Sequence, residues 1–174
     1  PGIYQTRGQL ACLVIAKREQ PRVFTPEQAE QLAKDGAIVL AEHAGEQPLL
    51  LIATGSYQLA EMQRAATRLS EAGCAWRLLY LQEPGRFRQP RDAWEAVGIT
   101  SAERVEQLFP AACSQRVWLT HMRAEVARGH AWPLLGGPQQ TRVLGYRNRG
   151  GTLDEAGMLF ANKASWAHVL QAAA

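Results

Sequence analysis

A short basic segment near the carboxyl end of the chain has the residue types that bind phosphate. Arg147 and Arg149 are followed directly by Gly150 and Gly151. Guanidinium groups form paired hydrogen bonds with phosphate oxygens, and glycines leave backbone N–H groups accessible to an anion. The segment could therefore hold a phosphate ester, or it could form salt bridges to Asp154 or to a carboxylate of a neighbouring domain.

A second candidate lies where an apolar run ends. Residues 49–53 are all apolar, and Thr54, Gly55 and Ser56 follow them. A helical apolar pattern begins immediately afterwards, so Ser56 stands at the expected start of a helix. Its hydroxyl and the first N–H groups of that helix could bind an anion, or Ser56 could serve only as the N-cap.

A β-α-β unit must position this turn. An unbroken apolar run is typical of a strand that is buried on both faces of a parallel sheet. Gly73 ends the helix that follows, and residues 76–81 form a second apolar run. The crossover of such a unit is right-handed, and its first turn lies at the carboxyl edge of the sheet, where open α/β folds bind ligands.

The remaining pattern predicts more strands that alternate with helices. The strand at 37–42 is separated from the strand at 49–54 by a short turn, so we expect it to run antiparallel to the others. Another strand, at 10–16, stands apart across a polar linker. The main body has five predicted strands, at 37–42, 49–54, 76–81, 116–120 and 142–146.

Polar residues mark the expected starts of three helices. Thr25 and Gln28 have capping-box spacing, and so do Thr100 and Glu103. Asn162 is expected to cap the C-terminal helix. Strands that alternate with capped helices are typical of an α/β domain.

The composition narrows the class of protein. The chain has 174 residues and a net charge of +3, with its basic residues spread along the sequence, so no nucleic-acid surface is indicated. Three distant cysteines and no Cys-x-x-Cys pair suit a cytoplasmic protein without a zinc site or any other assigned metal. No signal peptide or long apolar stretch indicates secretion or membrane insertion. Because the sequence begins at Pro1 and not at an initiator Met, we expect an excised piece of a longer polypeptide or a processed product.

These elements resemble the C-terminal domain of transketolases. The resemblance rests on the strand that ends in Ile52-Ala53-Thr54-Gly55-Ser56, the helix after it and the strand at 76–81. It covers most of residues 37–170. The tail is more similar to that of phosphoketolases, because seven residue types recur at that family's spacing: Gly145, Tyr146, Gly150, Thr152, Met158, Asn162 and His168.

The resemblance implies a three-layer α/β/α domain over residues 37–174, with a five-stranded mixed sheet whose first strand is antiparallel. Residues 1–36 would be an arm, made of the end of a pyrimidine-binding domain and a connecting helix. The implied parent is a dimeric enzyme that uses thiamine diphosphate and Mg²⁺ to transfer two-carbon units between sugar phosphates. The Gly-Asp-Gly motif that binds this cofactor is absent here, so the chain alone should neither bind the cofactor nor turn over substrate.

The implied strand order adds two candidate residues. It places the strands at 49–54 and 116–120 side by side, so the gap between their carboxyl ends is a topological switch point. His121 and Arg123 follow the second strand and would line this gap with Ser56. Ordinary solvent-facing polar residues at the start of a helix explain the same pattern.

Three functions remain open at this level, and one of them is a pure interaction domain. The first is a C-terminal domain of a transketolase- or phosphoketolase-like enzyme, which contributes to subunit assembly and to sugar-phosphate binding at the site entrance. The second is a stand-alone doubly wound module that binds a nucleotide or another anion. No Gly-x-Gly-x-x-Gly fingerprint supports a dinucleotide, and no catalytic residue is assigned in any of these cases.

Overall fold

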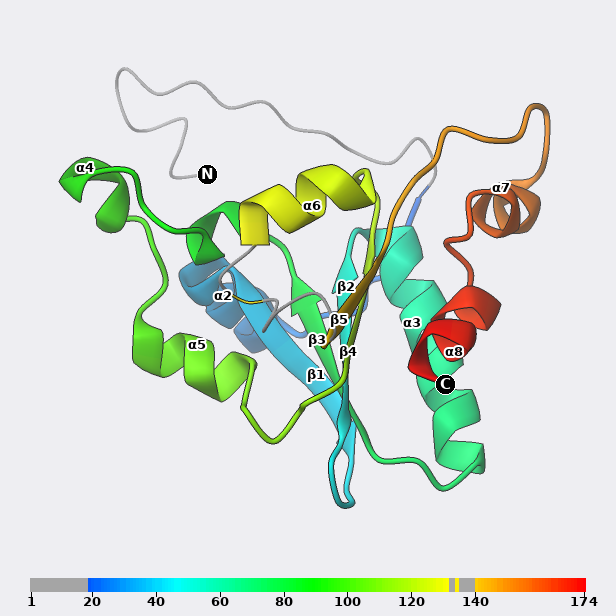
Figure 1. Ribbon diagram of the computed structural model, residues 1–174, viewed down its shortest axis with the longest axis horizontal. Coiled ribbons are helices and arrows are strands. Elements are labelled where there is room, and N and C mark those ends of the chain that lie inside the picture. Colours follow the sequence, from blue (N-terminus) through cyan, green and yellow to red (C-terminus); the bar gives the residue numbers. More distant parts are fainter. Residues whose placement is uncertain (1–18, 132–133, 135–139) are drawn as a thin grey trace.

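A five-stranded mixed sheet forms the centre of the structure (Figure 1). The structure is a computed structural model that describes residues 19–131, 134 and 140–174. The spatial order of the strands is β1-β3-β2-β4-β5, with β1 antiparallel to β3 and the other pairs parallel. The strands are β1 (Ala37–His43), β2 (Leu49–Thr54), β3 (Trp76–Leu81), β4 (Arg116–Thr120) and β5 (Thr141–Leu144).

The sequence-based prediction of the sheet is confirmed, including its antiparallel first strand. Three boundaries differ, because β1 ends at His43 and not at residue 42, and β5 runs from Thr141 to Leu144 and not from 142 to 146. The chain leaves β5 after Leu144 because the Tyr146 N–H donates to the carbonyl of Met122, outside the sheet. The strand predicted at 10–16 lies outside the described residues.

The central strand, β2, is buried on both faces. Leu50 and Ile52 belong to one core cluster, whereas Leu51 and Ala53 belong to a second cluster on the other face. Because successive side chains of a strand point to opposite faces, two-sided burial requires the unbroken apolar run seen in the sequence.

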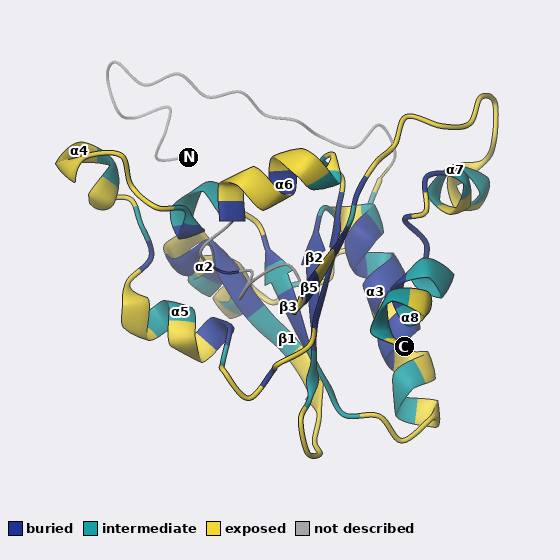
Figure 2. Cartoon of the chain, in the orientation of Figure 1, coloured by how far each residue is buried: buried dark blue, intermediate teal, exposed yellow. Residues whose placement is uncertain are grey.

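Helices cover both faces, which confirms the three-layer architecture (Figures 1 and 2). On one side lie α2 (Pro26–Asp35), the 3₁₀ turn η1 (Pro84–Phe87), α5 (Ala102–Leu108) and α6 (Ala124–Ala131). On the other side lie α3 (Ser56–Glu71), α7 (Glu155–Ala161) and α8 (Trp166–Ala173). The short α4 (Ala93–Ala96) projects away from the sheet, and buried residues gather on the strands between the helical layers.

The capping box predicted for α2 is present, whereas the one predicted for α5 is not. The Thr25 hydroxyl accepts from the N–H of Gln28, and the Gln28 side chain accepts from the N–H of Thr25. The N-cap of α5 is Ser101. The Thr100 hydroxyl is buried and donates to the carbonyl of Asp35, because a buried hydroxyl needs a hydrogen-bond partner.

A buried carboxylate fixes the start of α8 against α3. The residue Glu61 is only 3% exposed, and one of its oxygens accepts from Arg64 at 2.7 Å. Its other oxygen accepts from the N–H of Trp166 at 2.7 Å. Negative charge is favourable at a helix N-terminus because the first N–H groups have no partner within the helix. Glu61 thereby fixes the start of α8, which follows the turn that contains Lys163.

Candidate anion-binding site

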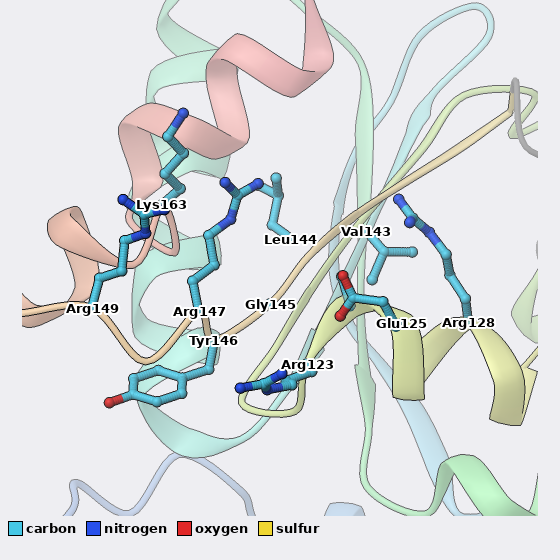
Figure 3. A pocket seen from close by; sticks show the side chains of 11 residues that line it. Arg123, Glu125, Arg128, Val143, Leu144, Gly145, Tyr146, Arg147, Arg149 and Lys163 are labelled. Carbon is cyan, nitrogen blue, oxygen red and sulfur yellow. The ribbon is translucent and has the colours of Figure 1, made fainter.

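Five basic side chains surround a pocket at the carboxyl ends of β4 and β5 (Figure 3). The pocket has a volume of about 390 Å³. Its walls come from the start of α6, the end of β5 with the segment after it, and the turn between α7 and α8. The basic side chains are those of Arg123, Arg128, Arg147, Arg149 and Lys163, and Glu125 is the one carboxylate in the lining.

None of these five cations forms an ion pair within residues 19–131, 134 and 140–174. The ion pairs in this part of the chain involve six other arginines. The salt bridge to Asp154 considered from the sequence is not formed, because the Asp154 carboxylate caps α7 and accepts from the N–H of Gly157 at 2.7 Å. The pocket therefore concentrates positive charge that an anion would neutralise.

The side-chain amide of Asn162 fixes the backbone of the basic segment. Its oxygen accepts from the N–H groups of Arg147 at 3.1 Å and Arg149 at 2.9 Å. Its nitrogen donates to the carbonyls of Arg149 at 2.7 Å and Met158 at 2.8 Å. Residue 162 is 1% exposed, and these four bonds use the full capacity of an amide. The prediction that Asn162 caps α8 is wrong, since the N-cap is Ser165.

Neither predicted glycine lines the pocket. Gly150 has φ of +109°, and a side chain there would lie 2.8 Å from the sulfur of Met158, so only glycine allows this turn to pack on α7. Gly151 is exposed and also lies outside the lining. The contribution of the segment to the pocket thus comes from its guanidinium groups.

The close approach of β5 to α6 depends on Gly145. A side chain at this position would lie 2.5 Å from the carbonyl oxygen of Met122 and 2.6 Å from the nitrogen of Ala124. Without a side chain, the chain after β5 crosses the start of α6 in contact with it. The crossing brings Arg147 to the same pocket as Arg123, although the two residues lie far apart in sequence.

The predicted switch point between β2 and β4 exists, but its polar groups bond to one another. The N–H of His121 donates to the Thr54 carbonyl at 3.2 Å, and the ring Nδ1 of His121 lies 3.1 Å from the same oxygen. The Thr54 hydroxyl accepts from the indole of Trp118 at 3.0 Å. His121 is thus directed to the backbone of β2, and of the two residues predicted after β4 only Arg123 reaches the basic pocket.

Ser56 lies in a different place. The N-cap of α3 is Gly55, and Ser56 is the exposed first residue of the helix. It borders a separate pocket of about 490 Å³ together with Phe24 and Tyr80. Burial raises the pKa of the Tyr80 phenol, and a hydrogen bond with the Gly55 backbone acts in the opposite direction. Ser56 therefore shares no pocket with the basic residues.

The ring of His168 lies close enough to the basic cluster to be affected by its charge. Its Nδ1 lies 2.8 Å from the Ser165 hydroxyl, and the ring packs against Phe160 with centroids 5.0 Å apart. Partial burial lowers the pKa of His168, and the positive charges of Lys163 and Arg147 lower it further.

Comparison with solved structures identifies the fold. No protein-family model and no curated protein matches the sequence. The chain is similar to transketolase from Leishmania mexicana (TM-score 0.56, 14% identity, 81% of this chain and 18% of that one). It is also similar to transketolase from Pichia stipitis in complex with sedoheptulose 7-phosphate, with a TM-score of 0.56 and 14% identity over 82% of this chain and 18% of that one. A split-gene transketolase, described as an inactive β4 tetramer, matches with TM-score 0.58 and 17% identity over 88% of this chain and 45% of that one.

The chain therefore has the fold of the transketolase C-terminal domain, as the sequence predicted. It spans less than a fifth of the length of the transketolases from Leishmania mexicana and Pichia stipitis, for which the covered share is 18%. At these identities the similarity establishes the fold alone.

The residues present do not fit a thiamine diphosphate site. The sequence contains no Gly-Asp-Gly motif. In the part of the chain that the structure describes, no group of three or more His, Cys, Asp or Glu side chains could hold a metal ion. A search of the same residues finds no helix with the length and apolar character needed to cross a membrane.

Replacing Lys163 by glutamine should raise the pKa of His168, because one of the charges that disfavour the imidazolium is removed. NMR titration of the histidine ring measures this directly, with Lys34→Gln on the distant α2 as the control. Since the pKa of His168 lies below its ordinary value, its protonation favours the unfolded chain, so its effect should lower stability as the pH falls below about 6.5. An unchanged His168 titration in Lys163→Gln would contradict the proximity of these charges.

Proposed function

We propose that this chain is the C-terminal domain of a transketolase- or phosphoketolase-like enzyme and holds the phosphate of a sugar phosphate at the site entrance. The observation that carries the proposal is the convergence of five cations without carboxylate partners among the described residues. The similar Pichia stipitis transketolase is a complex with a sugar phosphate, which supports this class of ligand. Thiamine diphosphate and Mg²⁺ would be bound by other parts of the enzyme.

The arrangement of the cations suits a phosphate dianion. Arg147 and Arg149 lie on one side of the pocket beside Lys163, and Arg123 approaches from the start of α6 (Figure 3). Ala124, the first residue of α6, also lines the pocket, so the positive end of that helix adds to the potential. Because Asn162 already fixes the backbone between the two arginines, less conformational entropy is lost when an anion binds.

We also propose that α4 is a subunit contact. Trp94 is 89% exposed, and Val97, the residue that follows α4, is 86% exposed. The helix α4 projects away from the sheet (Figure 1). This segment is ordered by charge, since the Glu95 carboxylate pairs with Arg91 and Arg88. Hydrogen bonds from Arg91, together with the charge of Arg88, lower the pKa of Glu95 to about 2. Ordered, exposed tryptophan is characteristic of interface anchors.

The phosphate proposal predicts that the chain binds inorganic phosphate and ribose 5-phosphate but not ribose. Arg147→Gln and Arg149→Gln should each weaken both phosphate ligands by roughly tenfold, because each removes a charge-assisted hydrogen bond. Calorimetric titration measures this. Arg142→Gln, on β5 but outside the pocket, is the matched control and should leave phosphate affinity unchanged. Equal affinity for ribose, or full phosphate affinity in both variants, would exclude the proposal, and much tighter binding of a nucleotide would favour the nucleotide-binding alternative.

The assembly proposal predicts self-association of the chain through α4. Sedimentation equilibrium at micromolar concentrations should show a dimer that Trp94→Ser with Val97→Ser dissociates, because the anchor is lost. Val126→Ser, an exposed apolar residue on α6, is the control and should leave the dimer intact. A monomeric wild-type chain throughout the concentration range would show that α4 does not join copies of this chain.

A further inference from the structure

A second hollow adjoins the anion-binding pocket and shares part of its lining. It has a volume of about 430 Å³. Five residues line both hollows, and three of these are cations, namely Arg128, Arg147 and Lys163. Arg142 from β5 and His168 from α8 line the second hollow only. An anion in either hollow can therefore contact the three shared cations.

Arg142 and His168 lie on the same side of the sheet. Arg142 is the parallel partner of Val117 in β4, and partners in register direct their side chains to the same face. Val117 belongs to the core cluster that also contains Val169 of α8. The exposed side chain of Arg142 is thus on the face that α8 covers, where it lines the second hollow together with His168.

The side chains that line only the second hollow can donate hydrogen bonds to an anion. Arg142 forms no ion pair within residues 19–131, 134 and 140–174. The Ser165 hydroxyl lies 2.8 Å from the Nδ1 of His168, and when this hydroxyl donates, the ring proton is on Nε2 and can be given to an anion. Among the described residues, the lining of this hollow includes no carboxylate.

The two hollows together hold more positive charge than one phosphate neutralises. Their combined lining has six cations and one carboxylate, a net charge of +5, whereas the whole chain carries +3. A phosphate monoester carries a charge of about −2, so one phosphate leaves about +3 and two leave about +1. The cations are Arg123, Arg128, Arg142, Arg147, Arg149 and Lys163, and the carboxylate is Glu125.

We propose that the two hollows bind one small molecule that carries two phosphate groups, with one phosphate in each hollow. The inference rests on the proposed phosphate site, which takes the first phosphate. The second phosphate contacts Arg142 and the Nε2 of His168, and the shared cations lie near both phosphates. Hydrogen bonds between ionised groups are about twice as strong as neutral ones, so the second phosphate adds affinity that a monophosphate lacks. A sugar with two phosphates and a diphosphate share this chemistry.

The test compares fructose 1,6-bisphosphate with fructose 6-phosphate, which differ by one phosphate, in calorimetric titration of the 174-residue chain. The bisphosphate should bind at least about tenfold more tightly, because its second phosphate gains a charge-assisted hydrogen bond. Pyrophosphate and inorganic phosphate form a second pair. A gain in the sugar pair alone assigns two separated phosphates, and a gain in the inorganic pair assigns adjacent ones. No gain in either pair would overturn the inference.

Three variants show which hollow each phosphate occupies. Arg142→Gln should weaken the ligand with two phosphates by about tenfold and leave fructose 6-phosphate unchanged, because Arg142 lines only the second hollow. Arg149→Gln should weaken both fructose phosphates, because Arg149 lines only the first. Lys34→Gln on α2 removes the same charge outside both hollows and should change neither affinity. An unchanged affinity for the two-phosphate ligand in Arg142→Gln would also overturn the inference.

The failure of this inference can be told from the failure of the proposed phosphate site. If fructose 6-phosphate binds and Arg149→Gln weakens it, but the bisphosphate binds no more tightly, only the second phosphate position is lost. If neither fructose phosphate binds, the proposed phosphate site is lost as well. The ring NMR signals of His168 give a separate measure, since they should shift with the bisphosphate far more than with an equal occupancy of fructose 6-phosphate.

Discussion

The buried amide of Asn162 is the interaction on which the basic pocket depends. It bonds to the backbone of Arg147 and Arg149 and directly precedes Lys163, so it gathers three cations in one place. Each neutral hydrogen bond contributes about 1 kcal/mol, and two exposed like charges at close range repel by an amount of the same order. The free energy from the Asn162 hydrogen bonds and the repulsion between the neighbouring cations are thus of similar size, and a bound anion would remove that repulsion.

The sheet decides where this cluster forms. Since β4 and β5 are parallel, their carboxyl ends lie at the same edge, and the segments after them meet where Gly145 allows contact. The switch point between β2 and β4, which is the usual ligand site of such folds, is occupied by hydrogen bonds among Thr54, Trp118 and His121. The accessible basic residues lie instead beside the edge strand β5, where α6 contributes Arg128 and the turn between α7 and α8 contributes Lys163.

The fold could be read from the sequence because its signals are local. The apolar run of β2, the helix after it and the caps of α2 each follow from adjacent residues. The site was only partly accessible in this way. Arg123, Arg147 and Arg149 stood out because they follow strands, but Arg128 lies within a helix and Lys163 follows one, without a motif around them. Asn162 was assigned to the wrong helix, because its partners lie 13 and 15 residues earlier in the chain.

The most direct test is phosphate binding by Asn162→Ala, with Gln171→Ala on the exposed side of α8 as the control. We predict that Asn162→Ala keeps the far-ultraviolet spectrum of the folded chain, loses about 2 kcal/mol of unfolding free energy, and binds inorganic phosphate roughly tenfold more weakly in calorimetry. The control should match the wild-type chain in all three respects. Undiminished phosphate affinity in Asn162→Ala would show that the pocket does not depend on this amide.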